Sequence, residues 1–388
     1  MSNYKVLFNL RILKNILETF VESFLVLYFL EVSASNILPL GIYKLISVIT
    51  TFLVIFFTRN LAKSKYRISV LRIGIIFDFI FFFTIIVLKE KIVDYIFLIG
   101  LLYGLEEGFY YSVFNPIESD GITNDERTKF IGSYTAVKSI LSIIFPLVFG
   151  SLIYATSFIK SIIIVLIIVA LRIFLSFIFK DKNLPKRNKA NMKEYYKLTK
   201  NNKQINCLYK SLFFNGITYS QGAFSYIVTI YIVKVFSNSF SLGVVTSLFS
   251  MLTCLLGIWY AKFLKPKHYP LVIKISTVLT VLSLILMIFK CNMVTIVLFN
   301  LFQTVYKNML EIINTTSRAN LSNLDIIKTE YKIEFSVAYE CYYVVSRVIS
   351  NLLFILMAFT DSILIMFIFV IFFILYGYYS IKLQKVIE

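Results

Sequence analysis

The sequence predicts an all-α polytopic membrane protein with twelve transmembrane helices. Of its 388 residues, 59% are hydrophobic, whereas soluble domains contain about 45–50%. Apolar runs of about 20 residues, the length that spans the hydrocarbon core of a bilayer, recur along the chain. Runs such as FDFIFFFTIIVL are continuous, whereas the strands of a membrane β-barrel alternate polar and apolar residues.

The apolar runs form two groups of six. The first group covers residues 8–30, 38–58, 68–88, 94–114, 130–154 and 158–179, and the second covers 205–236, 240–263, 271–289, 293–313, 333–359 and 362–381. A basic loop at 59–67 follows the second run. A polar loop follows the fourth run of each group, at 115–129 in the first group and at 314–332 in the second. We therefore expect an N-terminal six-helix bundle at 1–179, a cytoplasmic basic linker at 180–204 and a C-terminal six-helix bundle at 205–388.

The formal net charge of +18 is best explained by membrane topology. Most lysines and arginines fall in the loops that lie on the same side as both termini and the central linker, and basic residues mark the cytoplasmic side of a membrane protein. We expect both termini in the cytoplasm of a bacterial cell, with the spans in its plasma membrane. No segment outside the spans is suited to nucleic acid.

Metal and cofactor chemistry has little support in the sequence. The chain has one histidine, His268, and its four cysteines are scattered, so neither a zinc nor a haem ligand set is evident. No phosphate-binding glycine loop ends in Lys-Ser or Lys-Thr. We expect no cofactor and no enzymatic activity, since a membrane transferase would need a partner for His268.

Two six-span halves in parallel order resemble the major facilitator superfamily, a class of secondary transporters. The basic loop that begins at Arg59 is similar to that family's loop between its second and third spans, although the glycine and the acid are absent. Asp125-Glu126-Arg127 after the fourth span also looks family-like. Pro146 and Gly150 in FPLVFG are similar to a motif of the family's exporters. The resemblance implies that the first and fourth spans of each half line a central cavity.

Ionisable residues inside the spans are the main functional signal, because a charge at mid-bilayer costs about 2.5–3.5 kcal/mol. Arg11, Lys14, Glu18 and Glu22 form one stripe on the first span. This stripe either faces the cavity or packs against other helices, in which case Lys14 forms an ion pair with Glu18. Asn15 on the first span corresponds to Asn215 on the seventh.

Glu106 and Glu107 in the fourth span point about 100° apart on a helix. We expect one of them, by preference Glu107, to face the cavity, and the other to pair with Lys138 or Arg72. The alternative is a fixed ion pair that closes an inner gate. Tyrosines on the cavity spans suit cationic or amphipathic molecules, or they simply pack. The tyrosines selected here are Tyr103, Tyr110, Tyr111, Tyr219 and Tyr306.

Charges in the second half are expected mainly to pair internally, although Lys307 and Glu311 are also candidates for the proton-coupling and substrate cavity. Lys307 and Glu311 lie four residues apart, and Glu340 and Arg347 lie seven apart on one helix face. Asp78, six residues from Arg72, is interpreted as structural. The candidates for gating and conformational change are Arg59, Arg127, Lys138, Pro146, Gly150, Glu340 and Arg347.

The preferred function is secondary transport by alternating access, as proton-coupled efflux of an amphipathic or cationic compound. The expected partners are a small-molecule substrate, protons and the lipid bilayer, and the expected state is a monomer. Two alternatives remain open: a carrier of the same fold for nutrient uptake or lipid movement, and a non-transporting membrane sensor or scaffold.

Overall fold

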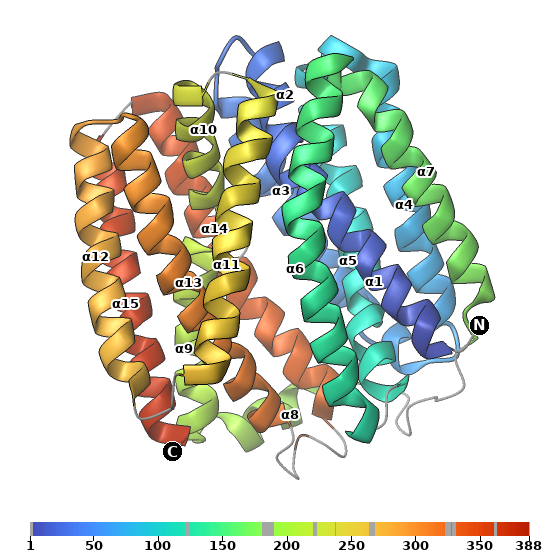
Figure 1. Cartoon of the computed structure of the whole chain (residues 1–388). Coiled ribbons are helices and arrows are strands. Elements are labelled where there is room, and N and C mark those ends of the chain that lie inside the picture. The colour runs from blue at the N-terminus through green and yellow to red at the C-terminus, as the bar shows by residue number, and fades with distance from the viewer. Residues whose placement is uncertain are drawn as a thin grey trace. The chain divides into compact units, whose positions relative to one another are not determined.

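The computed structural model describes residues 3–121, 124–180, 190–219, 223–236, 238–263, 268–322, 327, 331–360 and 363–387, and all regular structure within these ranges is helical. The chain divides into two compact units (Figure 1). The first unit comprises Met1–Ala190 with Asn238–Ser247, and the second comprises Asn191–Ser237 with Leu248–Glu388.

Six spans make up most of the first unit. The first span is continuous but has three parts, because a π-helical segment separates two α-helices. In chain order the elements are α1 (Asn3–Phe20), η1 (Val21–Leu25), α2 (Val26–Val32), α3 (Leu38–Thr58), η2 (Leu61–Lys63), α4 (Arg67–Leu88), η3 (Lys89–Val93), α5 (Ile96–Gly121), α6 (Asn124–Ala155) and α7 (Phe158–Ile178).

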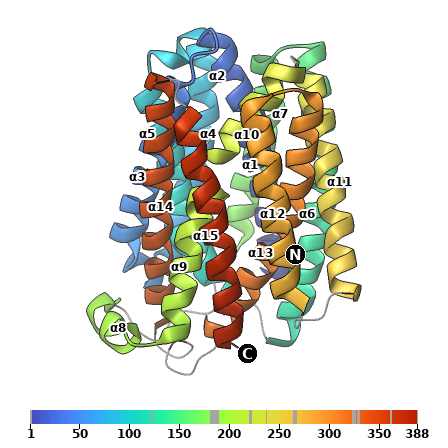
Figure 2. The ribbon, with the colours of Figure 1, turned by 90° about the vertical axis from the view of Figure 1, so that its left-hand side faces the viewer.

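The second unit repeats this plan and adds one short helix. Its elements are α8 (Met192–Thr199), α9 (Lys203–Thr218), α10 (Phe224–Phe236), α11 (Ser239–Phe263), α12 (Tyr269–Phe289), α13 (Met293–Ser322), α14 (Lys332–Thr360) and α15 (Ile363–Ile387). The first turns of α11 belong to the first unit. Helix α8 lies at the end of α9 (Figure 2), and the hydroxyl of Tyr195 is 2.5 Å from that of Tyr209.

All twelve predicted spans correspond to helices, but four details of the prediction were wrong. The predicted loop at 115–129 is helical except at residues 122 and 123, which lie outside the described residues, and α13 continues into the predicted loop at 314–332. The seventh span is divided into α9 and α10, and the first contains η1. Hydropathy defines only the part of a helix that meets lipid, so polar extensions and local changes of helix type leave no hydropathy signal.

The surface of the spans is suited to lipid. Eight helices in the described part of the chain are long and apolar enough to cross a membrane. Phe57, Phe97 and Phe289 are 71%, 67% and 74% exposed, and large apolar side chains on a surface mark membrane contact. The four other predicted spans are α1–α2, α5, α9–α10 and α13, which are the first and fourth of each half.

Three glycines hold α5 tightly against α3. Gly100, Gly104 and Gly108 repeat every four residues, so they share one helix face. A Cβ atom on Gly104 would lie 2.6 Å from the backbone oxygen of Ser47, and one on Gly100 would lie 2.7 Å from that of Tyr43. Small residues at such positions let backbones approach closely. Helix α4 also packs along α5, so α3, α4 and α5 form one block.

Replacing Gly104 by alanine is therefore expected to destabilise the protein by about 1–3 kcal/mol, the usual range for overpacking a tight contact. Thermal unfolding in detergent measures the effect. The matched control is Gly257→Ala in α11, because no atom lies within 4 Å of a Cβ at that position. Equal unfolding temperatures for the two variants would contradict the close packing of α3 on α5.

Candidate functional site

The polar stripe of α1 faces α5 through three side chains, each of which has a partner on α5. Arg11 forms an ion pair with Glu118, and its guanidinium carbon is 4.0 Å from the ring centre of Tyr134 on α6. Lys14 reaches Glu106 and Glu107. Glu18 accepts a hydrogen bond from the Tyr111 hydroxyl. Arg11, Lys14 and Glu18 are three and four residues apart, so they share one face of α1. Their contacts form a ladder between α1 and α5.

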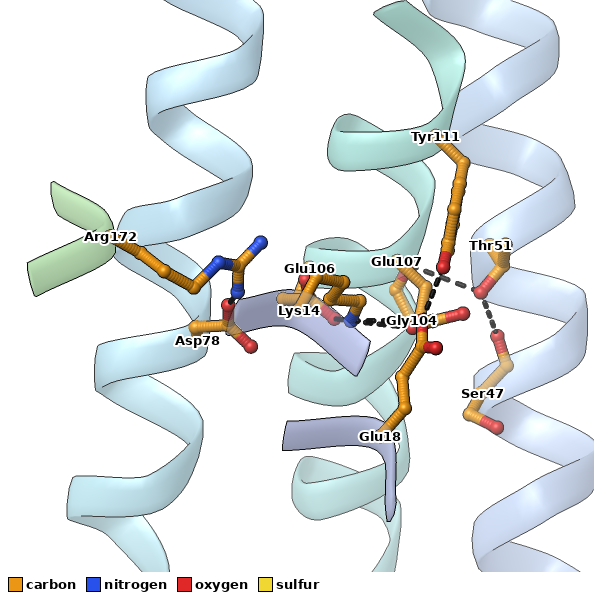
Figure 3. A network of polar contacts seen from close by, with 10 residues as sticks. All are labelled: Lys14, Glu18, Ser47, Thr51, Asp78, Gly104, Glu106, Glu107, Tyr111 and Arg172. Carbon is orange, nitrogen blue, oxygen red and sulfur yellow. Dashed lines mark hydrogen bonds and ion pairs between the residues drawn. The ribbon is translucent and has the colours of Figure 1, made fainter. Parts of the chain in front are cut away.

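Lys14 occupies the centre of this ladder (Figure 3). Its Nζ atom is 2.5 Å from Glu106 Oε2, 2.7 Å from Glu107 Oε1 and 3.9 Å from Glu18 Oε1. The side chains of Lys14, Glu106 and Glu107 are at most 3% exposed, whereas that of Glu18 is 20% exposed. We call Lys14, Glu18, Glu106 and Glu107 the Lys14 cluster.

A second buried ion pair lies beside the Lys14 cluster. Arg172 of α7 pairs with Asp78 of α4, and both side chains are buried. The ring of Tyr110 contacts both groups, since its centre is 4.9 Å from the Arg172 guanidinium carbon and 5.7 Å from Lys14 Nζ. The two adjoining sites therefore bring four carboxylates, from Glu18, Glu106, Glu107 and Asp78, together with Lys14 and Arg172.

This concentration of buried acids determines what the site can do. A charge in a low-dielectric interior is costly unless it is neutralised by a proton or paired with a cation. A group of acids that meets at one lysine is thus suited to bind a proton or a positively charged ligand when that lysine moves away.

The structure changes the predicted partners of three acids. Glu106 and Glu107 both contact Lys14, a shared partner that the sequence analysis did not name. This is possible because a long lysine side chain can lie between two carboxylates that leave the helix about 100° apart. Asp78 pairs with Arg172, whereas the side chain of Arg72 donates to the backbone oxygen of Ser176, 3.2 Å away.

The remaining site candidates of the first unit belong to α1, η1, the end of α3 and α6. Asn15 is buried on α1, whereas Glu22 is exposed and lies in η1. Arg59 donates to the backbone oxygen of Phe56 at the end of α3. Lys138 is half-buried on α6, and the side chain of Arg127 lies outside the described residues.

Pro146 and Gly150 of α6 make a close contact with the first turns of α11. A Cβ atom on Gly150 would lie 2.7 Å from the backbone oxygen of Ser239, and Gly243 packs against the backbone of Pro146. Ser247 also donates to the backbone oxygen of Ile143, 2.6 Å away. The Pro146–Gly150 segment is thus part of a backbone-to-backbone helix contact.

In the second unit, the candidates on α9 and α13 lie in neutral and aromatic networks. Asn215 donates to the Tyr343 hydroxyl at 3.0 Å. Tyr219 is buried with its ring centre 6.1 Å from that of Tyr306, whose hydroxyl donates to the backbone oxygen of Phe373. This unit therefore holds its buried polar groups mainly by hydroxyl and amide contacts.

The charged candidates of the second unit differ in exposure, since Arg347 is buried whereas Lys307 and Glu311 are exposed. Arg347 lies 3.8 Å from Glu340, the internal pairing that their shared face predicts. Lys307 is exposed, and its Nζ atom is 5.7 Å from the ring centre of Tyr219. Glu311 is exposed on the same helix.

Two residues of the site region were missed by the sequence analysis. Arg172 is a charge in the middle of the very apolar α7, far from the exposed Lys160 in the first turn of that helix, and a charge in such a position is a signal that could have identified it as a buried ion-pair partner. Lys44 is a second buried lysine, on α3, with its Nζ atom 5.7 Å from the ring centre of Tyr103. Within the described residues no group of histidine, cysteine, aspartate and glutamate is arranged to hold a metal ion.

Apolar helices in two six-span halves, with ionisable groups buried between spans, define a polytopic membrane transporter fold. The sequence pattern of the Major Facilitator Superfamily matches residues 41–319, and this chain belongs to that family.

Solved transporters share this fold over nearly their whole length. A bacterial homologue of the iron transporter ferroportin, crystallised in an inward-facing state, superposes with a TM-score of 0.65 at 12% identity, over 99% of this chain and 100% of that chain. The nucleoside transporter NupG gives a TM-score of 0.67 at 13% identity, over 98% of this chain and 100% of that chain.

Two bacterial proteins are similar in sequence. The uncharacterized protein YqgE of Bacillus subtilis (strain 168) is 22% identical over 331 residues, which are 83% of this chain and 75% of that protein. An uncharacterized protein encoded in the sodM 3' region of Geobacillus stearothermophilus is 30% identical over 114 residues, 29% of this chain and 53% of that protein.

The Asp78–Arg172 pair gives a direct test of the buried charges. Removing one partner, as in Asp78→Leu or Arg172→Met, is expected to cost about 3–5 kcal/mol because the other charge stays buried without its partner. The double variant Asp78→Leu/Arg172→Met should be more stable than either single variant. Thermal unfolding of all four proteins measures this, and strictly additive losses in the double variant would contradict the pairing.

Proposed function

We propose that this chain is a proton-coupled secondary transporter that exports a small amphipathic or cationic compound by alternating access. One observation carries the proposal: three carboxylates, from Glu18, Glu106 and Glu107, gather around Lys14, and all of these side chains except that of Glu18 are buried. Such a cluster joins the first and fourth spans of the first half, which line the cavity in transporters of this architecture. The identities of 12% and 13% with the solved transporters concern the fold, so the proposal rests on this chain's own residues.

Proton binding acts on the contact between α1 and α5. With its carboxylates ionised, the Lys14 cluster holds α1 against α5 by charge-assisted hydrogen bonds, which are about twice as strong as neutral ones. A proton on Glu106 or Glu107 removes the charge that holds Lys14 and weakens this attachment. Loss of the proton restores it, so protonation and the position of α1 are coupled.

The π-helical segment η1 is the point at which the direction of α1 can change relative to α2. It begins at Val21, three residues after Glu18, and π-helical turns inside α-helices are frequent at functional sites. A change of helical turn within η1 rotates α1 relative to α2, so α1 can leave α5 while α2 keeps its packing. Glu22 is an exposed carboxylate within η1, so it belongs to the segment whose helical turn changes.

Export is supported by the segment from Pro146 to Gly150, which is similar to the motif of exporters in this family. The substrate preference is supported by the tyrosines around Lys14, since aromatic rings and carboxylates together attract cations. We further propose that the chain acts as a monomer in a bacterial plasma membrane, with the 180–204 linker and both termini in the cytoplasm, because the basic loops lie on that side.

Transport in proteoliposomes tests the proposal. With an imposed pH gradient and the amphipathic dye cation ethidium, we expect Glu106→Gln and Glu107→Gln each to lower gradient-driven flux about tenfold or more, the effect of losing one charge-assisted contact. Glu90→Gln is the matched control, because Glu90 is an exposed acid in η3. Undiminished gradient-driven flux in both cluster variants would show that these acids do not couple transport to protons.

A further inference from the structure

The Lys14 ammonium lies inside a cage of six groups. Three are the carboxylates of the Lys14 cluster, at 2.5, 2.7 and 3.9 Å from Nζ. The other three are the rings of Tyr103, Tyr110 and Tyr111, whose centres are 5.7, 5.7 and 5.8 Å from Nζ. An ammonium group has three N–H donors, and its charge is attracted by aromatic faces within about 6 Å. The cage therefore has the composition of a site for an organic ammonium ion.

Five of the six cage groups are on one helix. Glu106, Glu107 and the three tyrosines all belong to α5, which the glycine contacts fix against α3. Lys14 itself comes from α1, which packs mainly against α6 and α7. Withdrawal of α1 would remove Lys14 and Glu18 together and leave the other five groups in place. The cage is thus a preformed feature of α5, and Lys14 is its occupant from another helix.

Lys14 does not satisfy every polar atom of the cage. Glu106 Oε1 is buried and has no hydrogen-bond partner among the described residues, and the same holds for the Tyr110 hydroxyl. Glu18 lies beyond hydrogen-bond distance of Lys14 Nζ at 3.9 Å. Buried polar atoms without partners are rare in native proteins and call for an explanation. A ligand amine, free of the geometric limits of the α1 backbone, could contact these atoms.

We propose that the cage is a binding site for a primary or secondary organic amine in its protonated form, and that Lys14 closes this site in the present conformation. The substrate amine and Lys14 then exclude each other, so the chain carries its own competitor for the substrate. This inference rests on the proposed transport function for its biological role, but the binding that it states is independent of proton coupling.

Removal of the lysine side chain provides the test. In detergent, the Lys14→Ala variant should be stabilised by n-butylammonium, which carries the same ammonium group on the same four-carbon chain as a lysine side chain, with a rise of several degrees in its unfolding temperature. The unfolding temperature of the wild-type chain should not change, because Lys14 occupies the cage. The uncharged analogue n-butanol and sodium ions at the same concentration should have no effect on Lys14→Ala. No stabilisation by n-butylammonium would overturn the proposal.

Two further variants locate the effect in the cage. Lys14→Ala/Glu106→Gln/Glu107→Gln should lose the response to n-butylammonium, since the carboxylates are gone. Lys63→Ala is the matched control, because Lys63 is a buried lysine that belongs to η2 and is not one of the cage groups. A response of Lys63→Ala equal to that of Lys14→Ala would mean that amines stabilise any lysine cavity, and would contradict a specific site.

The test remains decisive if Lys14→Ala does not fold alone. Cells are then solubilised with n-butylammonium or n-butanol present, and the folded fraction is measured by size-exclusion chromatography. Recovery with the amine alone supports the cage, whereas equal recovery or none with both compounds contradicts it. Amine binding by Lys14→Ala together with undiminished gradient-driven flux in Glu106→Gln and Glu107→Gln would retain the cage and refute proton coupling. Reduced flux in those two variants without amine binding would refute the cage alone.

Discussion

The contact of Lys14 with Glu106 and Glu107 is the interaction on which the first unit depends. Three buried charged groups require one another, because each alone would be a costly uncompensated charge in an apolar surrounding. The contact also joins two differently packed parts of the unit. Helix α5 is fixed against α3 by close glycine contacts, whereas α1 packs mainly on α6 and α7. Long side chains thus join α1 to α5, and their charge state controls how firmly the two helices are held together.

The two units use different polar chemistry for similar helical plans. The first unit buries ionic groups, including the Asp78–Arg172 pair. The second buries hydroxyl and amide groups, as where Ser211 donates to Asn314 at 2.8 Å and Asn314 donates to the Tyr376 hydroxyl at 2.7 Å. The second unit also buries Glu334 and Arg347, so the difference lies in the cluster of acids around Lys14. This difference is why the proposed proton coupling is sought in the first unit.

Sequence analysis predicted the spans well, because hydropathy and the distribution of basic loops are properties of single segments. It also identified Glu106 and Glu107, since adjacent acids in an apolar run are conspicuous. It did not predict their shared partner. Lys14 is 92 residues from Glu106, and a pairing across helices depends on packing that no local pattern encodes. For the same reason Asp78 was matched to nearby Arg72, although Arg172 on α7 lies closer in the fold. The π-helical segment was missed because it differs from an α-helix in hydrogen bonding and not in residue type.

The most direct test of the central claim is the distance between α1 and α5, measured by paired spin labels in a chain whose four cysteines have been replaced. The wild-type cluster should give one narrow distance distribution. The double variant Glu106→Gln/Glu107→Gln, which mimics full protonation, should give a broadened or lengthened distribution because Lys14 has lost its charged partners. An unchanged distribution in the double variant would contradict the claim that these charges hold α1 against α5.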